Sequence, residues 1–349
     1  MEQTETNKGE LFTKIKQLPK IELHAHLNGS IRKSTLMEAL SEEDKERIHT
    51  LYSVMDFNSA MEFFKITSKV ASTIELVKRI TREMIEDWNK NNTIYLEIRT
   101  SLKDTKNYNK KEYLNAILEE IDICNHNINM VTRLIISLDR TKSIKEYEEV
   151  LSIYRTIKNQ TLKNLIVRID YSGNEEKEKH KYEDIVPIFK KFKEEGLKIT
   201  IHMGECTNYQ QFPFDIFLPD RISHAHFFSD DDYISFMKRK IPIEICPTSS
   251  FKCTHSNNYK EIPFSKIYNK KIIMSNGSEY TYDLVSINTD DTMLLLTDIS
   301  QEYFEISSNF TLDIKKLKEL IIKGIDSIFE KDESVKKRLR EIVNEFKIN

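Results

Sequence analysis

The sequence predicts a (β/α)₈ barrel, an α/β fold in which eight parallel strands alternate with helices. Two observations support this prediction. Short β-branched runs alternate with longer amphipathic segments almost from end to end, and reactive side chains gather where the runs end. Eight strands, each followed by a helix, fit a closed barrel better than a doubly wound sheet. A chain of 349 residues is long enough for such a barrel with insertions.

Eight runs are expected to form the barrel strands. They are Lys20–His24, Ile94–Arg99, Val131–Asp139, Leu165–Tyr171, Lys198–His202, Arg221–His224, Pro242–Cys246 and Val285–Asp290. Apolar residues recur with helical spacing between them, as in Leu76–Trp88, Glu112–Ile123 and Tyr147–Ile157.

Additional helices are expected at two places. Residues 34–70 have room for a helical lid over the barrel mouth, and residues 312–347 are expected to add two helices outside the barrel. Residues 266–283 are less regular and look like an insertion before the last strand. No linker, composition shift or internal repeat divides the chain, so residues 1–349 are expected to form one domain.

Composition argues against several classes of partner. With 53 basic and 56 acidic residues, the formal net charge is −3, so charge gives no support for nucleic-acid binding. The polar N-terminus lacks the apolar run of a signal peptide, and no apolar stretch is long enough for a membrane span. Four cysteines without CxxC pairing are expected to be reduced thiols. We expect a cytoplasmic, monomeric enzyme with a small-molecule substrate.

Metal-binding side chains stand at the ends of four predicted strands, where the active sites of such barrels lie. These ends carry His24 and His26, His202 and Glu205, His224 and His226, and Asp290 and Asp291. A single HxH pair is more often a polar strand end or two buried histidines that hydrogen-bond to backbone. Four such ends in register favour a metal site.

The first strand and two distant strands together offer the ligands of one catalytic zinc ion. His24 and His26 lie two apart on a strand, so their side chains point the same way. His202 and the carboxylate of Asp290 complete a set of three or four protein ligands that leaves a position for water. We expect one Zn²⁺ per chain, which would lower the pKa of its water to about 7.

Two further residues have the chemistry of proton carriers. His224, on a neighbouring strand, is placed to deprotonate or orient the water, and Glu205 is placed to donate a proton from the opposite side of the substrate. An isolated glutamate at such a position is more often a solvated loop carboxylate.

The motifs of this chain resemble those of the adenosine/AMP deaminase family over nearly the whole sequence. The opening run, residues 18–30, ends in Asn28-Gly-Ser and is closer to the N6-methyl-AMP deaminase branch than to adenosine deaminase proper. The other motifs that resemble the family are Ile169–Asn174, His202–Glu205, Cys246–Ser249, Thr289–Asp291 and Ser300–Tyr303. The resemblance implies the same four zinc ligands.

The resemblance also implies a reaction. Hydroxide from the zinc-bound water would add at purine C6 while Glu205 protonates N1 and His224 assists the water. Asp291 would hydrogen-bond N7, the Gly173 backbone would hydrogen-bond N3, and His26 would also contact the substrate. Loss of ammonia or methylamine would leave an inosine-type product.

Three positions depart from the family pattern. The glycines that flank the strand-six histidine are replaced by Ser223 and Ala225, and the added His226 competes for the role of the first histidine, which the motif register favours. The family asparagine after Cys-Pro-Thr-Ser is Ser250. A histidine of the methyl-AMP branch aligns with Ser68, so that part of the pocket is expected to differ.

Donors for a 5′-phosphate gather at one side of the predicted mouth, which favours a nucleoside monophosphate over a nucleoside. The candidate donors and substrate contacts there are Asn28, Ser30, Arg32, Lys33, Arg99, Thr100, Ser101, Lys103 and Arg140. Asp139 instead fits a ribose hydroxyl, as it does in the branch that the chain resembles.

The leading hypothesis is hydrolysis of N6-methyl-AMP to IMP and methylamine, with adenosine deaminase second. Acceptance of the N6-methyl group rests on the resemblance alone. An amide or phosphotriester hydrolase would use two metals bridged by a carboxylated lysine on strand four, and that strand has no lysine at its end. A binding scaffold without activity would be expected to have lost metal ligands or Glu205, and none is lost.

Overall fold

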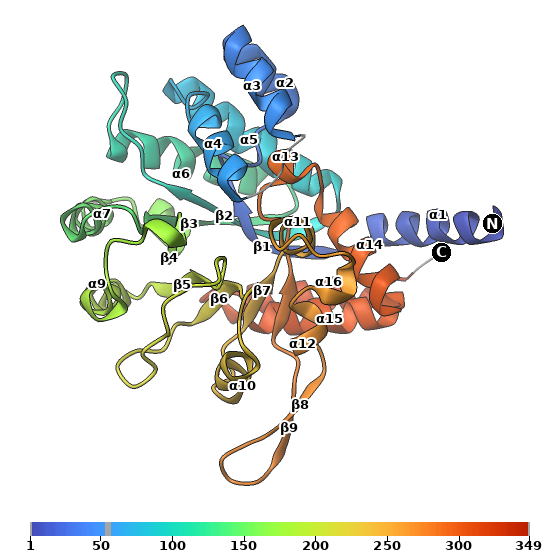
Figure 1. Cartoon of the computed structure of the whole chain (residues 1–349). Helices are drawn as coiled ribbons and strands as arrows, with labels where there is room; N and C mark the ends of the chain where they lie inside the picture. The colour runs from blue at the N-terminus through green and yellow to red at the C-terminus, as the bar shows by residue number, and fades with distance from the viewer. Residues whose placement is uncertain (1, 53–56, 348–349) are drawn as a thin grey trace.

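Eight parallel strands form a nearly closed barrel with helices around it (Figure 1). The computed structural model describes residues 2–52 and 57–347, so residues 53–56 of the expected lid lie outside the described residues. In hydrogen-bonded order the strands are β1 (Lys20–His26), β2 (Thr93–Ser101), β3 (Val131–Asp139), β4 (Ile166–Ser172), β5 (Lys198–Met203), β6 (Arg221–His224), β7 (Ile243–Ile245) and β10 (Val285–Ile287). The barrel prediction is confirmed, and every strand lies on a predicted run.

The barrel closes through the segment that follows β10. The backbone N–H of Asp290 donates to the carbonyl of His24 at 2.9 Å, and the N–H of His26 donates to the carbonyl of Asp290 at 3.0 Å. This parallel bridge pairs Asp290 with Ala25. Strand β10 itself ends at Ile287, before the predicted end at Asp290, where the backbone turns left-handed with φ 66°. The closure brings a carboxylate beside both histidines of β1.

Helices follow most strands. They are α5 (Ile74–Lys90), α6 (Lys110–Asn127), α7 (Ile144–Arg155), α8 (Gln160–Asn164), α9 (Tyr182–Glu194) and α10 (Asp230–Lys238). Of these, α5, α6 and α7 lie over the three segments whose apolar spacing predicts a helix. Capping boxes fix several of the starts, among them those of α6 and α7. Asn109 accepts from the N–H of Glu112, which accepts from the N–H of Asn109, and Ser143 and Glu146 do the same for α7.

The connection from β5 to β6, residues 204–220, forms no helix, contrary to the expectation that each strand is followed by one. Pro213 lacks the N–H that a helix interior needs. Phe212 and Phe217 are buried beneath this loop, and the ring of Phe217 lies 5.5 Å from that of Phe189. Aromatic packing therefore fixes this loop in place of a helix.

The insertion after β1 contains α2 (Lys33–Ala39), α3 (Glu42–Tyr52) and α4 (Phe57–Thr67). Between β7 and β10 the chain forms α11 (Pro247–Cys253), η2 (Tyr259–Glu261), α12 (Phe264–Ile267) and the antiparallel hairpin of β8 (Lys270–Ile273) and β9 (Glu279–Tyr282). This hairpin projects from the body of the protein and accounts for the irregular residues 266–283 (Figure 1).

The remaining helices are α13 (Thr292–Leu295), α14 (Ile299–Phe310), α15 (Ile314–Asp326) and α16 (Glu333–Glu345), of which the last two form the C-terminal pair expected in residues 312–347. Helix α1 (Glu2–Gln17) was not expected. It packs on α14, where the rings of Phe12 and Phe304 meet edge to face at 5.4 Å. Within the described ranges, no helix has the length and apolar character needed to cross a membrane.

Candidate active site

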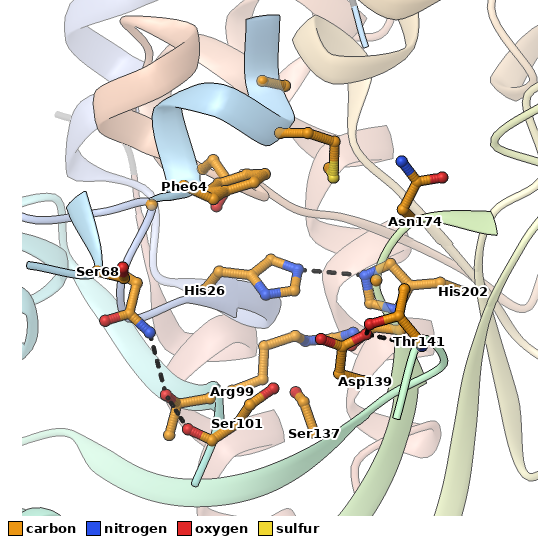
Figure 2. A pocket seen from close by; sticks show the side chains of 18 of the residues that line it. His26, Phe64, Ser68, Arg99, Ser101, Ser137, Asp139, Thr141, Asn174 and His202 are labelled. Atoms are coloured by element: carbon orange, nitrogen blue, oxygen red, sulfur yellow. Dashed lines mark hydrogen bonds between the residues drawn. The ribbon is translucent and has the colours of Figure 1, made fainter. Parts of the chain in front are cut away.

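Four side chains from three parts of the sheet converge at the carboxyl end of the barrel. The Nε2 atom of His26 lies 3.2 Å from Nε2 of His202 and 3.4 Å from Oδ1 of Asp290. The same oxygen of Asp290 lies 3.3 Å from Nε2 of His24. Figure 2 shows the imidazoles of His26 and His202 facing each other across the pocket floor. The structure therefore brings together the four residues that the sequence assigns to one ion.

Two buried carboxylates orient the imidazoles of this cluster. Nδ1 of His24 lies 2.8 Å from Oε2 of Glu244, and Nδ1 of His202 lies 2.8 Å from Oδ1 of Asp170. When Nδ1–H donates a hydrogen bond to a carboxylate, the lone pair of Nε2 is left directed into the cluster. Nε2 of His24 is buried and has no hydrogen-bond partner among the described residues. This donor set fits a metal ion.

Three groups of described residues have ligand atoms close enough together to hold a metal ion, and each contains at least one of the four residues that the sequence assigns to one ion. They are His24, His202 and His224; His24, Cys246 and Asp290; and His26, Asp290 and Asp291. The sequence analysis did not identify Cys246 as a neighbour of the site.

Glu244 belongs to a fully buried charge cluster beneath the imidazoles. It accepts hydrogen bonds from Arg99 at 2.7 Å, Arg168 at 2.8 Å and Arg221 at 2.5 Å. Burial alone would raise the pKa of Glu244, but the guanidinium groups of Arg221 and Arg99 hold it well below its usual range. Ser223, which replaces a family glycine, adds a hydrogen bond to Glu244 at 2.7 Å.

The position of Arg99 corrects one expectation. Its side chain lines the floor of the pocket, but the guanidinium is buried and paired with Glu244, not placed at the mouth to meet a phosphate. Two other expected donors are also engaged elsewhere. Arg32 pairs with Asp87 at 2.7 Å, and Arg140 donates to the carbonyl of His202 at 2.6 Å.

Glu205 and His224 lie beside the candidate metal-binding cluster of His24, His26, His202 and Asp290, and are 3.7 Å apart between Oε1 and Nε2. Burial raises the pKa of Glu205 to about 7, so the carboxyl retains a proton near neutrality. Burial lowers the pKa of His224 well below its usual value, so its imidazole is neutral. Neither ring nitrogen of His224 has a hydrogen-bond partner within the described structure.

His226 is the less suitable of the two strand-six histidines. The ring of His224 lies 4.7 Å from that of His24 and 4.9 Å from that of His202. His226 contacts the ring of His224 but belongs to none of the metal-binding groups formed by the described residues. The ring distances and the motif register therefore both favour His224 over His226 as the histidine that assists the water.

A cavity of about 800 Å³ opens above the cluster. Helix α4 forms one wall, and Figure 2 shows Phe64 above the imidazole of His26, with Ser68 at the edge. Nine of the expected substrate contacts line this cavity, namely His26, Asn28, Arg99, Thr100, Ser101, Lys103, Asp139, Gly173 and Asp291, whereas Ser30, Arg32, Lys33 and Arg140 are not among its lining residues.

Lys103 stands in this cavity without a carboxylate partner in the described part of the chain. Its ammonium donates to Oδ1 of Asn28 at 2.9 Å, and the amide of Asn28 donates to Thr100 at 3.3 Å. Burial lowers the pKa of Lys103 to about 8. A fixed ammonium without a counter-ion, beside hydroxyl groups, suits an anionic ligand group.

Asp291 is a neutral carboxyl group at the inner end of the cavity. Burial and the adjacent charge of Asp290 raise its pKa well above the usual range, so it can donate a hydrogen bond. Its Oδ1 has no partner among the residues described. On the opposite wall, Asp139 is fixed by Thr141, whose backbone N–H and hydroxyl both donate to Oδ1 at 2.9 and 2.8 Å.

The carboxylates behind the site and three lysines at its rim were not predicted from the sequence. Glu244 is the one polar residue of β7, and Asp170 is the one acidic residue of the buried strand β4, so an acidic residue within a strand was the available signal of a buried partner. Lys142, Lys177 and Lys179 come from the loops after β3 and β4. No spacing distinguishes them from other surface lysines.

A parallel barrel that carries imidazoles, carboxylates and a glutamate of raised pKa at its carboxyl end is typical of barrel enzymes of the hydrolase class. The family model for adenosine deaminase matches residues 19–346. The chain therefore belongs to the adenosine deaminase family. It is a deaminase of purine metabolism, a hydrolase acting on cyclic amidines.

Relatives in this family cover nearly the whole chain. It is 31% identical to the N6-mAMP deaminase of Arabidopsis thaliana, over 93% of this chain and 96% of that protein. It is 28% identical to the N6-methyl-AMP deaminase of Homo sapiens, over 95% and 94%. It is 29% identical to an adenosine deaminase of Clostridium botulinum, over 94% and 99%.

Solved structures agree with these relatives. A complex of ADAL with IMP has a TM-score of 0.81 at 28% identity and covers 95% of this chain and 98% of that one. Arabidopsis ADAL in complex with GMP has the same TM-score and identity, and covers 95% and 97%. The family and the fold predicted from the sequence are confirmed.

Proposed function

We propose that this chain is a zinc-dependent deaminase that hydrolyses N6-methyl-AMP to IMP and methylamine. In this proposal residues 1–349 act as one domain, with residues 34–70 as a lid over the pocket. One observation carries the choice of a nucleotide: the unpaired ammonium of Lys103 lies in the same cavity as the metal-binding cluster. The names of the Arabidopsis and human relatives agree with it.

His24, His26, His202 and Asp290 would hold one Zn²⁺. Three imidazoles and a carboxylate match the donors that zinc prefers, and the carboxylates behind His24 and His202 are the outer partners that such ligands usually have. When bound, the ion would lower the pKa of a water so that hydroxide is available near neutral pH.

The protein side chains would manage the protons and orient the purine. Glu205 would donate its proton to N1, which makes C6 more electrophilic, and its raised pKa supports this role. The neutral imidazole of His224 would take a proton from the attacking water. The protonated carboxyl of Asp291 would donate to N7, which is an acceptor, and the N–H of Gly173 would donate to N3.

The other end of the cavity would bind the ribose and phosphate. Asp139, already fixed by Thr141, would accept a hydrogen bond from a ribose hydroxyl. Lys103 would pair with the 5′-phosphate, with the hydroxyls of Thr100 and Ser101 beside it and Asn28 supporting the ammonium. Arg99 has no phosphate contact in this assignment because Glu244 occupies its guanidinium.

Adenosine deaminase is the second candidate, favoured by the similarity to the Clostridium botulinum enzyme of that name. The two are distinguished by measuring kcat/KM for N6-methyl-AMP, AMP and adenosine with the zinc-loaded protein. We expect N6-methyl-AMP to be the best substrate and adenosine the poorest. A preference for adenosine over both nucleotides would overturn the proposal in favour of the second candidate.

A further inference from the structure

Glu175 reaches from the loop after β4 to the turn that carries Glu205. It is the first residue of the short 3₁₀ turn η1 (Glu175–Lys177), and its side chain is buried. Its carboxylate accepts three consecutive backbone N–H groups: that of Gly204 at 3.1 Å, that of Glu205 at 2.7 Å and that of Cys206 at 3.0 Å. One side chain thus binds the whole turn around the proposed proton donor.

The conformation of this turn explains why an anion is needed there. Gly204 has φ 71°, and successive N–H groups of a turn with a left-handed residue converge on one point, which forms a small anion-binding concavity. On its other side the turn is tightly packed, because a Cβ at Gly204 would lie 2.6 Å from the ring of Phe228. The carboxylate of Glu175 occupies the concavity.

Arg140 connects this carboxylate to the metal-binding strand. One guanidinium nitrogen lies 3.4 Å from Oε1 of Glu175, and the other donates to the carbonyl of His202 at 2.6 Å. The guanidinium balances the charge of Glu175, and it fixes Glu175 relative to the strand from which Glu205 extends.

We propose that Glu175 is a positioning residue for Glu205, holding the turn of residues 204–206 so that the carboxyl of Glu205 stays directed at the purine. This inference rests on the proposed role of Glu205 as proton donor. A glutamine at position 175 has nearly the same shape, but its amide NH₂ would face at least one N–H donor of the turn. Glu175→Gln should therefore release the turn with little change in packing.

Glu178 offers a matched control. Its side chain is also largely buried, and its Oε2 lies 3.8 Å from the same Arg140 nitrogen, but among the described residues it accepts no hydrogen bond from the turn. With zinc-loaded protein, we expect Glu175→Gln to lower kcat about 100-fold and to change KM by less than about threefold, because geometry at the reacting atoms is lost while binding is kept. Glu178→Gln should keep kcat within about threefold of the unmutated value.

A second measurement does not depend on activity. Hydrogen exchange of the 204–206 amides should be slow in the unmutated protein and in Glu178→Gln, and faster in Glu175→Gln.

If Glu175→Gln does not fold, Glu175→Asp keeps the charge next to Arg140 but is too short to reach all three N–H groups. We expect faster exchange and a kcat about tenfold lower in this variant. Full activity in Glu175→Asp would overturn the proposal.

Comparison of Glu175→Gln, Glu205→Gln and the double variant distinguishes failure of the positioning role of Glu175 from failure of the proton-donor role of Glu205. If Glu205→Gln alone keeps its activity, the proton-donor role fails, and the positioning role fails with it. If Glu205→Gln is inactive but Glu175→Gln has normal kcat and exchange, only the positioning role fails. We expect the double variant to be no slower than Glu205→Gln, since both substitutions disable the same group.

Discussion

Asp291 occupies the space that any side chain at Gly29 would need. A Cβ built on Gly29 would lie 1.6 Å from Oδ1 of Asp291, far inside contact distance. The glycine of the opening motif thus fixes where the neutral carboxyl can stand, and Asp291 is the group assigned to purine N7.

Gly29→Ala should therefore act through Asp291. We expect kcat/KM for the nucleotide to fall about 100-fold because the carboxyl is displaced from its position. The measurement is steady-state kinetics on folded, zinc-loaded protein. Gly9→Ala is the control, since no atom lies within 4 Å of a Cβ there. Normal activity in Gly29→Ala would show that Asp291 is not needed where the structure places it.

Lys103→Met should separate nucleotide from nucleoside. Loss of the ammonium is expected to raise KM for N6-methyl-AMP by about 30-fold, which corresponds to the loss of one charge-assisted contact, and to leave the adenosine rate unchanged. The pKa of Lys103 is lowered to about 8, so KM for the nucleotide should also rise above that pH as the ammonium loses its proton. Lys33→Met, at an exposed position outside the cavity, serves as control.

The pH dependence of activity should follow the proton on Glu205. Its pKa is raised to about 7, so the carboxyl is mostly protonated below that pH and ionised above it. A proton donor must hold its proton, and we expect kcat/KM to decline as the pH rises through about 7. A profile from pH 5.5 to 9 tests this. Activity that increases steadily across that range would contradict the assignment of Glu205 as the acid.

Removal of the metal should abolish activity reversibly. Dialysis against a strong chelator is expected to leave inactive protein, and one equivalent of Zn²⁺ should restore it. Asp290→Asn should reduce zinc affinity by weakening one ligand. Metal analysis that finds two ions per active chain, or full activity without any, would exclude the proposed single-ion site.

Glu244→Gln should cost stability as well as metal affinity. The substitution leaves Arg99, Arg168 and Arg221 without their shared carboxylate, and breaking a buried ion pair typically costs about 3–5 kcal/mol. The free energy of unfolding in urea measures it. Glu62→Gln removes a solvent-exposed pair with Arg47 and should change the free energy of unfolding far less, because water and salt screen an exposed pair. Equal losses in the free energy of unfolding would show that the buried charge cluster contributes no more to stability than the exposed pair.

The sequence predicted the barrel and the place of the cluster because both depend on local patterns. The β-branched runs mark the strands, and a residue at the carboxyl end of a barrel strand faces the mouth in any such fold, as His24 and His202 do. Arg99 shows where this reasoning fails. It stands near the end of β2, but its long side chain turns inward to pair with Glu244. Glu244 lies on β7, five strands later in the sequence, and no spacing indicates that pairing.

Glu175 was missed for the same reason. In the sequence it is one of several acidic residues in a polar loop, and only the folded chain places it under the N–H groups of residues 204–206. The polar N-terminus likewise gave no sign of helix α1, whose contact at Phe12 depends on α14 almost 300 residues later. Such features depend on contacts between distant segments.

The bridge between Ala25 and Asp290 joins the first and last strands of the barrel, and the proposed zinc ligands lie on both sides of it. A growing polypeptide would contain His24, His26 and His202 long before Asp290 is synthesised. Complete coordination would therefore become possible only when the sheet has closed, and a bound ion would oppose separation of its two ends. A bound ion should therefore also slow unfolding, because it would lie where the first and last strands of the barrel meet.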